Sequence, residues 1–325
     1  MPFLSVLIPV YNGEHYLAEA ITSVIEQPCR DLEIIIANDG STDSSLEIAN
    51  RFAAQDERIR VVSHENCGPG MTRNKALPLM NGTWALFLDC DDIVLPQFYT
   101  EQMKDFLGAC LERGVESVVP ARLYANVDLT RANLDRVPFD EAFPYGSDAS
   151  WRVDAEFATL LYSLDMLRRE HIEFGVTRPA EMESIFKHKA IFSSKRTLFT
   201  NSLWFAVRRD NPFQTTKAKN WDTVLVDQIR FDAYGQLVEW HKKHGTTGFV
   251  IEEAERRKQA AADAIARSQE RKSLFTRFKE QRRKKADYEN WVKARRETER
   301  PIQEFILDEA RQQEAIRAAW ELVEK

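Results

Sequence analysis

Three carboxylates follow one short apolar segment, and they are the side chains of this chain best suited to chemistry. The segment Trp84–Leu88 has the composition of a buried strand, and Asp89, Asp91 and Asp92 come directly after it. Unpaired carboxylates are strongly unfavourable inside a low-dielectric core, so we expect them beyond the carboxyl end of the strand. In α/β sheets this end is where ligands bind. Clustered carboxylate oxygens there suit Mg²⁺ or Mn²⁺, and these ions suit a substrate that carries phosphate.

Three further polar segments follow strand-like segments in the N-terminal part of the chain. They are Pro9–Asn12, Asn38–Asp43 and Asn66–Asn74. The carboxyl ends of parallel strands share one edge of a sheet, so these loops would converge with the acidic group on one crevice. Asp39 can accept hydrogen bonds from a base or a ribose, and Arg73 can offer a planar fork to phosphate. The alternative is that Asp39 caps a helix and Arg73 is a surface cation.

Strand-like and helix-like segments alternate over residues 1–120, and they must position these loops. Short, mostly apolar runs, β-branched in Leu4–Val10, predict the strands Leu4–Val10, Leu32–Ala37, Ile59–Val62, Trp84–Leu88 and Val115–Val119. Helical patterns lie between them: one after Asn12, a reasonable N-cap; one after the turn Asn38–Asp43; one from Gly68 to about Leu79; and one from Pro96. This alternation predicts an α/β fold with a largely parallel sheet, covered on both faces by helices.

The pattern changes after this series. Residues 122–150 have no clear period and contain two prolines, which favours a long functional loop or a small insertion. A helical pattern runs from Trp151 to Arg169, another helix starts near Glu181, and Thr200–Val207 reads as a strand. From about Val226 to the end the chain consists mostly of helix formers, broken at Gly245–Gly248 and Pro301.

Composition limits the class of protein. The chain has 325 residues, 43% hydrophobic content and a net charge of −6, enough length for about two domains. Residues 251–325 hold 19 basic and 16 acidic side chains, so residues 1–250 carry the negative charge, which argues against nucleic acid as a partner. Four scattered cysteines form neither a disulfide framework nor a zinc pattern. With no apolar run long enough to span a membrane and no leader pattern, we expect a cytoplasmic protein.

Two common nucleotide-binding signatures are missing from the sequence. A dinucleotide-dependent dehydrogenase would carry G-x-G-x-x-G after its first strand, where this chain has Pro9-Val10-Tyr11-Asn12-Gly13. A P-loop enzyme would need G-x-x-x-x-G-K-[ST], which does not occur.

Four ordered motifs instead resemble family 2 glycosyltransferases of the GT-A fold. They are Val6-Leu7-Ile8-Pro9-Val10-Tyr11-Asn12, Asn38-Asp39-Gly40-Ser41-Thr42-Asp43, Thr72-Arg73-Asn74 and Leu88-Asp89-Cys90-Asp91-Asp92. The resemblance is strong over residues 3–121, weaker to about 215, and does not cover the C-terminal third. It implies a catalytic domain over residues 1–225, with 122–190 on the acceptor side, and a helical, charged region over 226–325.

The resemblance implies an inverting transfer of a sugar from a nucleotide diphosphate donor, a UDP-sugar in our reading, to a glycan or lipid-linked acceptor. By resemblance, Asp39 would bind the nucleobase, and Pro9, Tyr11 and Asn12 would shape the pocket for the base and ribose. Arg73 would lie near the base or the phosphates.

The same resemblance assigns the acidic group to the diphosphate. Asp89 would contact the ribose or the metal, and Asp91 would bind the Mn²⁺ or Mg²⁺ that bridges the diphosphate. A metal there could stabilise the charge that develops on the leaving group. For Asp92 we favour a structural role as a cap of the following helix.

An inverting transfer also needs a carboxylate that removes the proton of the acceptor hydroxyl. In this family the base is usually an Asp, the second residue of a Glu-Asp pair shortly before an aromatic residue. Alignment on Phe186 places Met182 and Glu183 at these two positions, so Glu183 is the candidate base and Glu181 the second choice. The alternative is that both are solvated carboxylates at a helix start.

Residues 271–285 contain eight basic side chains and one acidic one, and aromatic residues lie among them and up to residue 292. Such a helix could contact an anionic membrane surface at 271–292, but packing on the catalytic domain or a partner helix is the simpler interpretation. An apolar stripe after Pro301 suits docking or association into a homo-oligomer. Two alternatives to an active enzyme stay open: a donor-binding relative without catalysis, and a protein that docks through its C-terminal helices.

Overall fold

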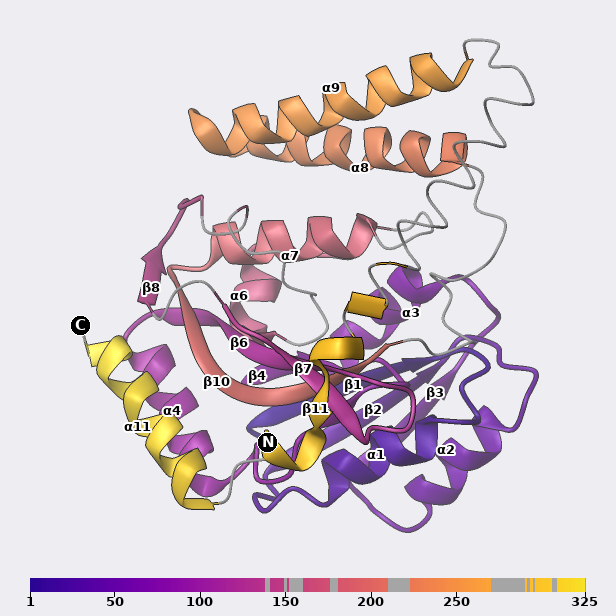
Figure 1. Ribbon diagram of the computed structural model, residues 1–325, viewed down its shortest axis with the longest axis vertical. Coiled ribbons are helices and arrows are strands. Elements are labelled where there is room, and N and C mark those ends of the chain that lie inside the picture. Colours follow the sequence, from indigo (N-terminus) through magenta and orange to yellow (C-terminus); the bar gives the residue numbers. More distant parts are fainter. Residues whose placement is uncertain are drawn as a thin grey trace. The chain divides into compact units, whose positions relative to one another are not determined.

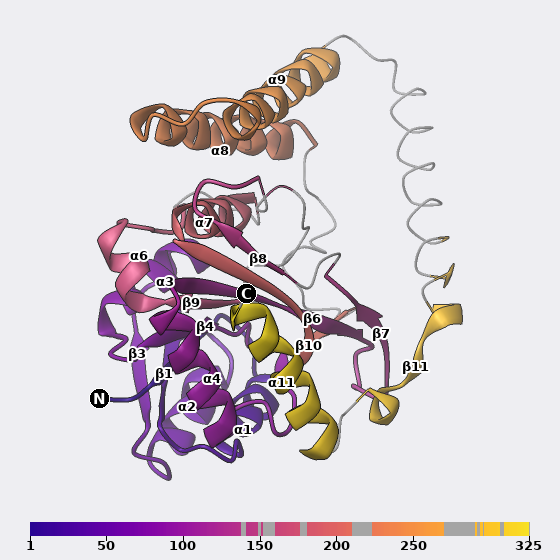
Figure 2. The same cartoon turned by 90° about the vertical axis from the view of Figure 1, so that its left-hand side faces the viewer.

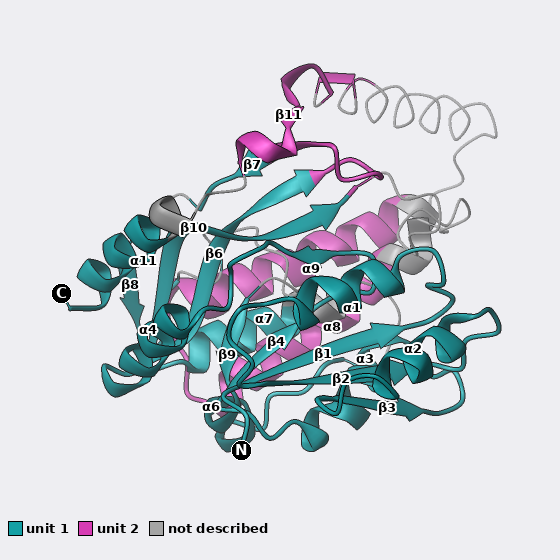
Figure 3. Ribbon diagram, turned by 90° about the horizontal axis from the view of Figure 1, so that it is seen from below, with its two compact units in different colours: residues 1–124, 134–208, 306–325 teal, residues 125–133, 209–305 magenta. Residues whose placement is uncertain are grey.

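The computed structural model describes residues 1–137, 141–148, 151, 160–175, 181–209, 223–269, 290, 293–294, 296–305 and 309–324. Contacts within the chain divide it into two compact units, coloured separately in Figure 3. The first unit holds residues 1–124, 134–208 and 306–325, and the second holds residues 125–133 and 209–305. The C-terminal residues 306–325 therefore belong to the same unit as the N-terminal strands.

Four parallel strands form the centre of the first unit (Figure 1), and they are β1 (Leu4–Val10), β2 (Leu32–Asn38), β3 (Ile59–Ser63) and β4 (Trp84–Phe87). β1 lies between β2 and β4, and β3 pairs with the outer edge of β2. All four predicted strands are confirmed to within one residue. The apolar side chains of β1, β2 and β4 are buried on both faces, as expected for parallel strands flanked by helices, whereas Val61 and Val62 of β3 are partly exposed.

One strand in the sheet was predicted as helix. Residues Leu161–Ser163 form β9, which lies antiparallel between β4 and β6 (Val115–Ala125). The helical prediction for residues 151–169 is wrong at β9 and holds at α6 (Leu164–Arg169), while residues 152–159 lie outside the described residues. Leu161 and Tyr162 are fully buried in this position. Pairing with two strands outweighs a weak helical period in so short a segment.

The region predicted as an unpatterned loop also contributes strands. β6 extends to Ala125, beyond the predicted end at Val119, and β8 (Glu141–Pro144) pairs antiparallel with β10 (Arg196–Arg208). β10 is longer than the predicted Thr200–Val207 and also pairs with the short β5 (Ile93–Val94). The sheet is thus parallel at its centre and mixed at one side. Of the two alternatives for residues 122–150, the strands in the described part of this region favour a small insertion over a long loop.

Helices flank the sheet of the first unit, namely α1 (Leu17–Ile25), α2 (Ser45–Ala53), α3 (Pro69–Ala76, continued by the 3₁₀ turn Leu77–Leu79), α4 (Glu101–Glu112), α6 and α7 (Glu181–Ser193). Two predicted starts are wrong. The helix expected from Pro96 begins at Glu101, where the Thr100 hydroxyl accepts a hydrogen bond from the backbone N–H of Met103. Asn12 does not cap α1, which starts five residues later.

The last helix, α11 (Glu309–Glu324), packs beside α4 in the first unit (Figure 2). Ile316, Ala319 and Val323 are at most 3% exposed and join the main apolar core. The ring centroids of Trp320 and Phe106 (in α4) lie 6.0 Å apart. The sequence suggested that this apolar stripe serves docking or self-association. In α11, the stripe packs instead into the core of the chain's own first unit.

The second unit contains a hairpin of two long helices, α8 (Thr223–Lys243) and α9 (Phe249–Gln269), which pack along each other. The turn between them holds Gly245 and Gly248 at positive φ, as the predicted break at these glycines requires. β11 (Arg300–Pro301) pairs with β7 (Arg131–Asp135), and the 3₁₀ turn Ile302–Glu304 follows it. Of the basic segment 271–292, only residue 290 lies among the described residues. In the described part of the chain, no helix is both long and apolar enough to cross a membrane.

Candidate functional site

The loops after β1 and β2 are joined by hydrogen bonds at the carboxyl edge of the sheet. The Asn12 amide oxygen accepts a hydrogen bond from the Thr42 backbone N–H at 2.8 Å, and the Asn12 N–H donates to the Ser41 hydroxyl at 3.0 Å. Asn12 has a φ of 51°, a conformation that asparagine tolerates better than most residues. Next to it, the Gly13 N–H donates to the Ser45 hydroxyl. Asn12 therefore fixes the rim of the site, which is a different role from helix capping.

Asp39 lies directly after β2 and is only 4% exposed. Its two carboxylate oxygens accept hydrogen bonds from the backbone N–H groups of Cys67 at 2.7 Å and Gly68 at 2.9 Å. These N–H groups immediately precede α3, so Asp39 orients the start of this helix. Each carboxylate oxygen can accept more than one hydrogen bond, so Asp39 can still receive a donor group from a ligand.

Gly40 allows the backbone after Asp39 to pass close to the loop after β3. Its φ is +68°, and a Cβ added at this position would come within 2.8 Å of the Asn66 backbone nitrogen. The Asn66 side chain donates to the carbonyl oxygen of Asp39 at 3.0 Å. The loop after β2, which begins with Asp39, is thus in direct contact with the loop after β3.

The acidic group lies beyond β4, as the sequence predicts. Asp89, Asp91 and Asp92 each place a carboxylate oxygen within 4.8 Å of the others. Arg73, whose side chain is 3% exposed, donates from Nη2 to Asp89 Oδ1 at 2.7 Å. The predicted site residues Arg73 and Asp89 are therefore brought together, and α3 connects Asp39 at its start with Asp89 through Arg73.

A second buried arginine contacts the same acidic group from β10. Arg208 donates its backbone N–H to Asp92 Oδ1 at 2.8 Å and its Nε–H to the Asp91 carbonyl oxygen at 2.8 Å. Its guanidinium also pairs with Glu19 and lies 4.5 Å from the ring centroid of Tyr16. Two guanidinium groups thus flank three carboxylates, which leaves an excess of negative charge for a cation to neutralise.

The role proposed for Asp92 in the sequence needs a correction. Asp92 is 4% exposed and accepts the Arg208 N–H, while the next helix, α4, begins only at Glu101 and is capped by Thr100. Asp92 does serve the structure, but by attaching the end of β10 to the loop after β4 rather than by capping a helix.

An aromatic group supports the segment before α7. Asn74 holds Phe174 through two reciprocal hydrogen bonds of 2.8 Å between its amide and the Phe174 backbone. The Phe174 ring stacks on Phe186 of α7, with centroids 3.8 Å apart and planes 3° from parallel, and both rings contact Phe87 at the end of β4. The base candidates Glu181 and Glu183 begin the same helix, but their side chains lie outside the described residues.

The remaining predicted pocket residues lie on β1 and the loop after it. Pro9 is buried in β1, in register with Ala37, and Tyr11 is 48% exposed. Tyr11 is thus available to a ligand, whereas Pro9 is part of the strand that carries the loop.

The donor set fits a hard divalent cation. Asp89 and Asp91 supply carboxylate oxygens that are partly accessible, whereas one oxygen of Asp92 is already engaged by a backbone N–H. Oxygen ligands are what Mg²⁺ and Mn²⁺ prefer, and both ions usually keep water or phosphate oxygens in their remaining positions.

Sequence reasoning missed Arg208, Asn74 and Phe174. Arg208 directly follows the predicted strand Thr200–Val207, and Asn74 follows Arg73. Their contacts, however, join residues 116 and 100 positions apart. It also missed His64 and Cys67, which lie beside Asp39. The only signal for that pair was its place in the loop after the third strand.

Comparison with known proteins agrees with this geometry. The family model described as glycosyl transferase family 2 matches residues 5–171. Glycosyltransferase GlyG of Streptococcus pneumoniae is 39% identical over 229 residues, which cover 66% of this chain and 73% of GlyG. Putative glycosyltransferase EpsH of Bacillus subtilis is 42% identical over 102 residues, or 31% of this chain and 29% of EpsH. The match spans less than half the length of several curated relatives.

Among solved structures, S. aureus TarS (residues 1–349, in complex with UDP-GlcNAc) superposes with a TM-score of 0.61 at 19% identity. The superposition covers 81% of this chain and 72% of TarS. This likeness confirms the predicted fold: a mostly parallel GT-A type sheet flanked by helices, with a helical C-terminal region. The family model matches half of the chain, and GlyG is similar over most of its own length. The chain therefore belongs to glycosyl transferase family 2.

Proposed function

We propose that the protein is an inverting, metal-dependent glycosyltransferase that moves a sugar from a UDP-sugar to a glycan or lipid-linked acceptor. The observation that carries this proposal is the link made by α3. Its start is held by Asp39, and Arg73 on the same helix holds Asp89. The helix α3 would thus connect the residue that binds the nucleobase, Asp39, with the acidic group that binds the diphosphate.

Asp39 serves as the anchor of the base in this proposal. Its carboxylate is fixed by two backbone N–H groups and keeps lone pairs that can accept the ring N–H of uracil. The exposed Tyr11 and the loop fixed by Asn12 form the neighbouring wall. A pocket built on backbone hydrogen bonds holds its shape before the donor arrives, which lowers the cost of binding.

Asp91 and Asp89 would hold the divalent cation. When bound, Mn²⁺ or Mg²⁺ would supply positive charge to the diphosphate of the leaving group. Arg73 keeps Asp89 in place, and Arg208 fixes the main chain at Asp91 and the side chain of Asp92. These two arginines also limit repulsion among the three carboxylates, so that the acidic group can exist before a cation binds.

Glu183 is the proposed general base, with Glu181 as the second candidate. The acceptor hydroxyl oxygen bonds to the anomeric carbon from the side opposite the diphosphate, and its proton passes to the carboxylate. The bond from the anomeric carbon to the diphosphate oxygen breaks with its electron pair, and the nucleoside diphosphate leaves. Support for this position comes from the stack of Phe174 on Phe186, which fixes α7 shortly after these residues.

The test is a transfer assay with a panel of nucleotide sugars and Mn²⁺, with UDP-GlcNAc, the donor in the TarS complex, as the first choice. Release of the nucleoside diphosphate above background is the expected result, together with inversion at the anomeric carbon. Glu183→Gln should reduce the rate by about 100-fold or more while donor binding persists, and Glu181→Gln is the matched control. If no nucleotide sugar in the panel binds or turns over, the proposal fails.

A further inference from the structure

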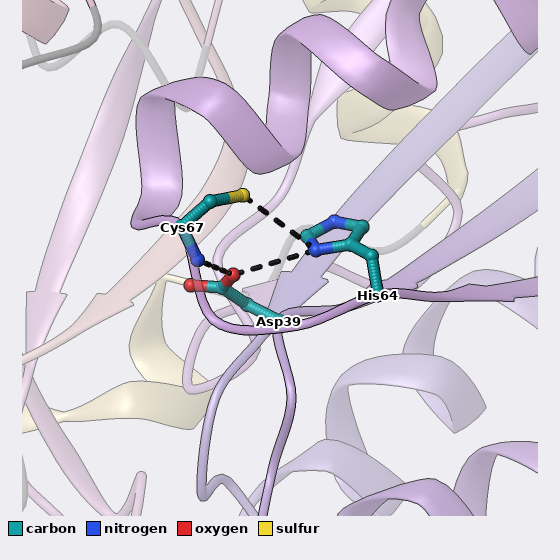
Figure 4. A group of neighbouring side chains, drawn as sticks. All are labelled: Asp39, His64 and Cys67. Carbon is teal, nitrogen blue, oxygen red and sulfur yellow. Dashed lines mark hydrogen bonds and ion pairs between the residues drawn. The ribbon is translucent and has the colours of Figure 1, made fainter.

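Asp39, His64 and Cys67 form a second cluster of potential metal ligands, distinct in chemistry from the acidic group (Figure 4). His64 Nδ1 lies 3.6 Å from Asp39 Oδ1 and 3.6 Å from Cys67 Sγ. One imidazole nitrogen thus faces both the carboxylate and the thiol. The cluster includes a sulfur and a nitrogen ligand, whereas the acidic group offers only oxygen.

These distances match the edges of a tetrahedral zinc site. With Zn–S near 2.3 Å and Zn–N near 2.05 Å, a tetrahedron places sulfur and nitrogen about 3.5 Å apart, and nitrogen and oxygen about 3.3 Å apart. The observed separations lie within a few tenths of an ångström of both values. The third edge, between Cys67 Sγ and the Asp39 carboxylate, is within 4.8 Å, so zinc could enter if these two ligands approach each other, and the fourth position would remain for water.

The backbone holds the three ligands near this arrangement. Asp39 is fixed by the N–H groups of Cys67 and Gly68, so its carboxylate and the Cys67 backbone are already joined. His64 follows the end of β3, and its own N–H donates to the carbonyl oxygen of Asn38 at 3.2 Å. All three ligands come from loops that hydrogen bonds connect, which reduces the entropy lost when a metal binds.

We propose that Asp39, His64 and Cys67 form a zinc site that competes with the nucleotide donor. A thiolate and an imidazole favour Zn²⁺ over Mn²⁺ and Mg²⁺, which prefer oxygen ligands. Binding releases the thiol proton of Cys67 to solvent. It also replaces the contact of 2.9 Å between His64 Nδ1 and the Glu65 carbonyl oxygen, so the proton of the neutral ring resides on Nε2. This Nε2 is buried and has no hydrogen-bond partner among the described residues, which is a third cost. Together the three costs keep the affinity moderate.

The competition follows from Asp39, and this step alone rests on the proposed function. A zinc ion held by Asp39 Oδ1 would occupy the remaining lone pair of this oxygen, and the competition requires that the nucleobase donate to the same oxygen. Mn²⁺ at the acidic group and Zn²⁺ at this cluster would then have opposite effects, one supporting donor binding and the other preventing it.

Cobalt is the probe that tests the metal site itself, because Co²⁺ takes zinc's tetrahedral sites and its bond to thiolate produces a charge-transfer absorption. The purified full chain is titrated with CoCl₂, and then with ZnCl₂ to displace it. We expect a thiolate-to-cobalt band in the wild type that zinc removes. Cys67→Ser should abolish the band, His64→Gln should weaken or abolish it, and Cys110→Ser is the matched control that keeps it. A band that persists in Cys67→Ser, or no band at all, overturns the site.

The second arm measures the affinity of UDP by calorimetry in excess Mn²⁺, with and without Zn²⁺. Zinc should weaken UDP binding by at least about tenfold in the wild type, and Cys67→Ser should lose most of this effect relative to its own zinc-free value. Zinc inhibition that persists in Cys67→Ser would come from the acidic group and would overturn the competition. If UDP binds and the Cys67-dependent cobalt band forms, but zinc leaves UDP affinity unchanged, the zinc site stands and the placement of the base at Asp39 fails.

Discussion

Arg73 Nη2 lies 2.7 Å from Asp89 Oδ1, and the two partners differ sharply in exposure: the arginine side chain is 3% exposed and the aspartate side chain 37%. The charge of Arg73 is thus buried, and it forms an ion pair with Asp89 at the edge of the site. The guanidinium also lies 5.4 Å from the ring centroid of Phe174. Arg73 therefore connects the acidic group with the segment that leads to α7.

This relationship predicts that lysine cannot replace Arg73. Arg73→Lys keeps the charge but loses the planar group that reaches Asp89 and lies over Phe174. We expect kcat/KM for sugar transfer to fall by about 10- to 100-fold, equivalent to about 1.4–2.8 kcal/mol. Steady-state kinetics with varied donor measure this. Arg60→Lys, at an exposed position where the side chain donates to the Leu79 carbonyl, is the control and should stay near wild type.

The contacts of Arg208 predict an effect on the Mn²⁺ dependence of activity. Arg208→Met removes the Nε–H donor to the Asp91 carbonyl and the ion pair with Glu19, while the backbone bond to Asp92 is kept. The main chain that carries Asp91 would be held less firmly, so we expect the Mn²⁺ concentration for half-maximal activity to rise by about tenfold. Activity measured against Mn²⁺ concentration checks this.

Glu19→Gln is the matched control for Arg208, because it removes only the ion pair. Its Mn²⁺ dependence should shift much less than that of Arg208→Met. Equal shifts in the two variants would contradict the role given to the bond with Asp91.

Gly70 predicts a steric effect on the segment before α7. A Cβ at this position would come within 2.2 Å of the Gly175 carbonyl oxygen, a distance that only a backbone shift can relieve. Gly70→Ala should move the segment held by Asn74 and lower kcat more than it changes donor affinity. We expect a loss of about tenfold or more in kcat, since small displacements of a reacting group are costly.

Gly108 provides the comparison, since a Cβ added there meets nothing within 4 Å. It lies inside α4, where Gly→Ala should stabilise the protein by up to about 1 kcal/mol without loss of activity. Reduced kcat in both variants would contradict the steric explanation.

Glu116 predicts how stability depends on pH. Burial alone would raise the pKa of this carboxyl, but hydrogen bonds from Arg169 and from the Lys195 N–H outweigh burial, and the pKa lies below its ordinary value of 4.5. The folded state thus favours the charged form. Its stabilising effect is complete above the ordinary pKa and is lost as the pH falls through the lowered pKa.

Glu116→Gln measures this contribution. We expect it to lower the free energy of unfolding by about 1–3 kcal/mol near pH 7, the range for hydrogen bonds to a charged group. The difference between variant and wild type should shrink steadily below about pH 4.5. Denaturant unfolding at several pH values gives both curves. A difference that stays constant with pH would contradict the ionised form of Glu116 as its source.

The sequence predicted the centre of the fold and the positions of the polar loops well, because both follow local patterns. Short, mostly apolar runs define β1 to β4, and polar residues directly after them mark the edge of the sheet. Asp39, Arg73 and Asp89 could be found in this way, and the structure brings the last two together.

The errors have a common physical origin in long-range pairing. Leu161–Ser163 becomes a strand only because β4 and β6 lie on its two sides. Likewise, the helix begins at Glu101 rather than Pro96 because long-range contacts hold the residues before it. The Leu95 N–H donates to the Trp204 carbonyl oxygen of β10, and the Tyr99 N–H donates to the Gln27 side chain. Arg208 reaches Asp92 from 116 positions away, and no local pattern predicts such a contact.

Calorimetric titration of UDP into the protein, with and without Mn²⁺, for the wild type and Asp91→Asn is the most direct test of the central claim. The asparagine has the size of the native side chain but lacks the charge that a divalent cation requires. We expect Mn²⁺ to strengthen UDP binding by at least about tenfold in the wild type and by less than about twofold in Asp91→Asn, with similar metal-free affinities. Equal strengthening by Mn²⁺ in both proteins would contradict a metal-assisted donor site at the end of β4.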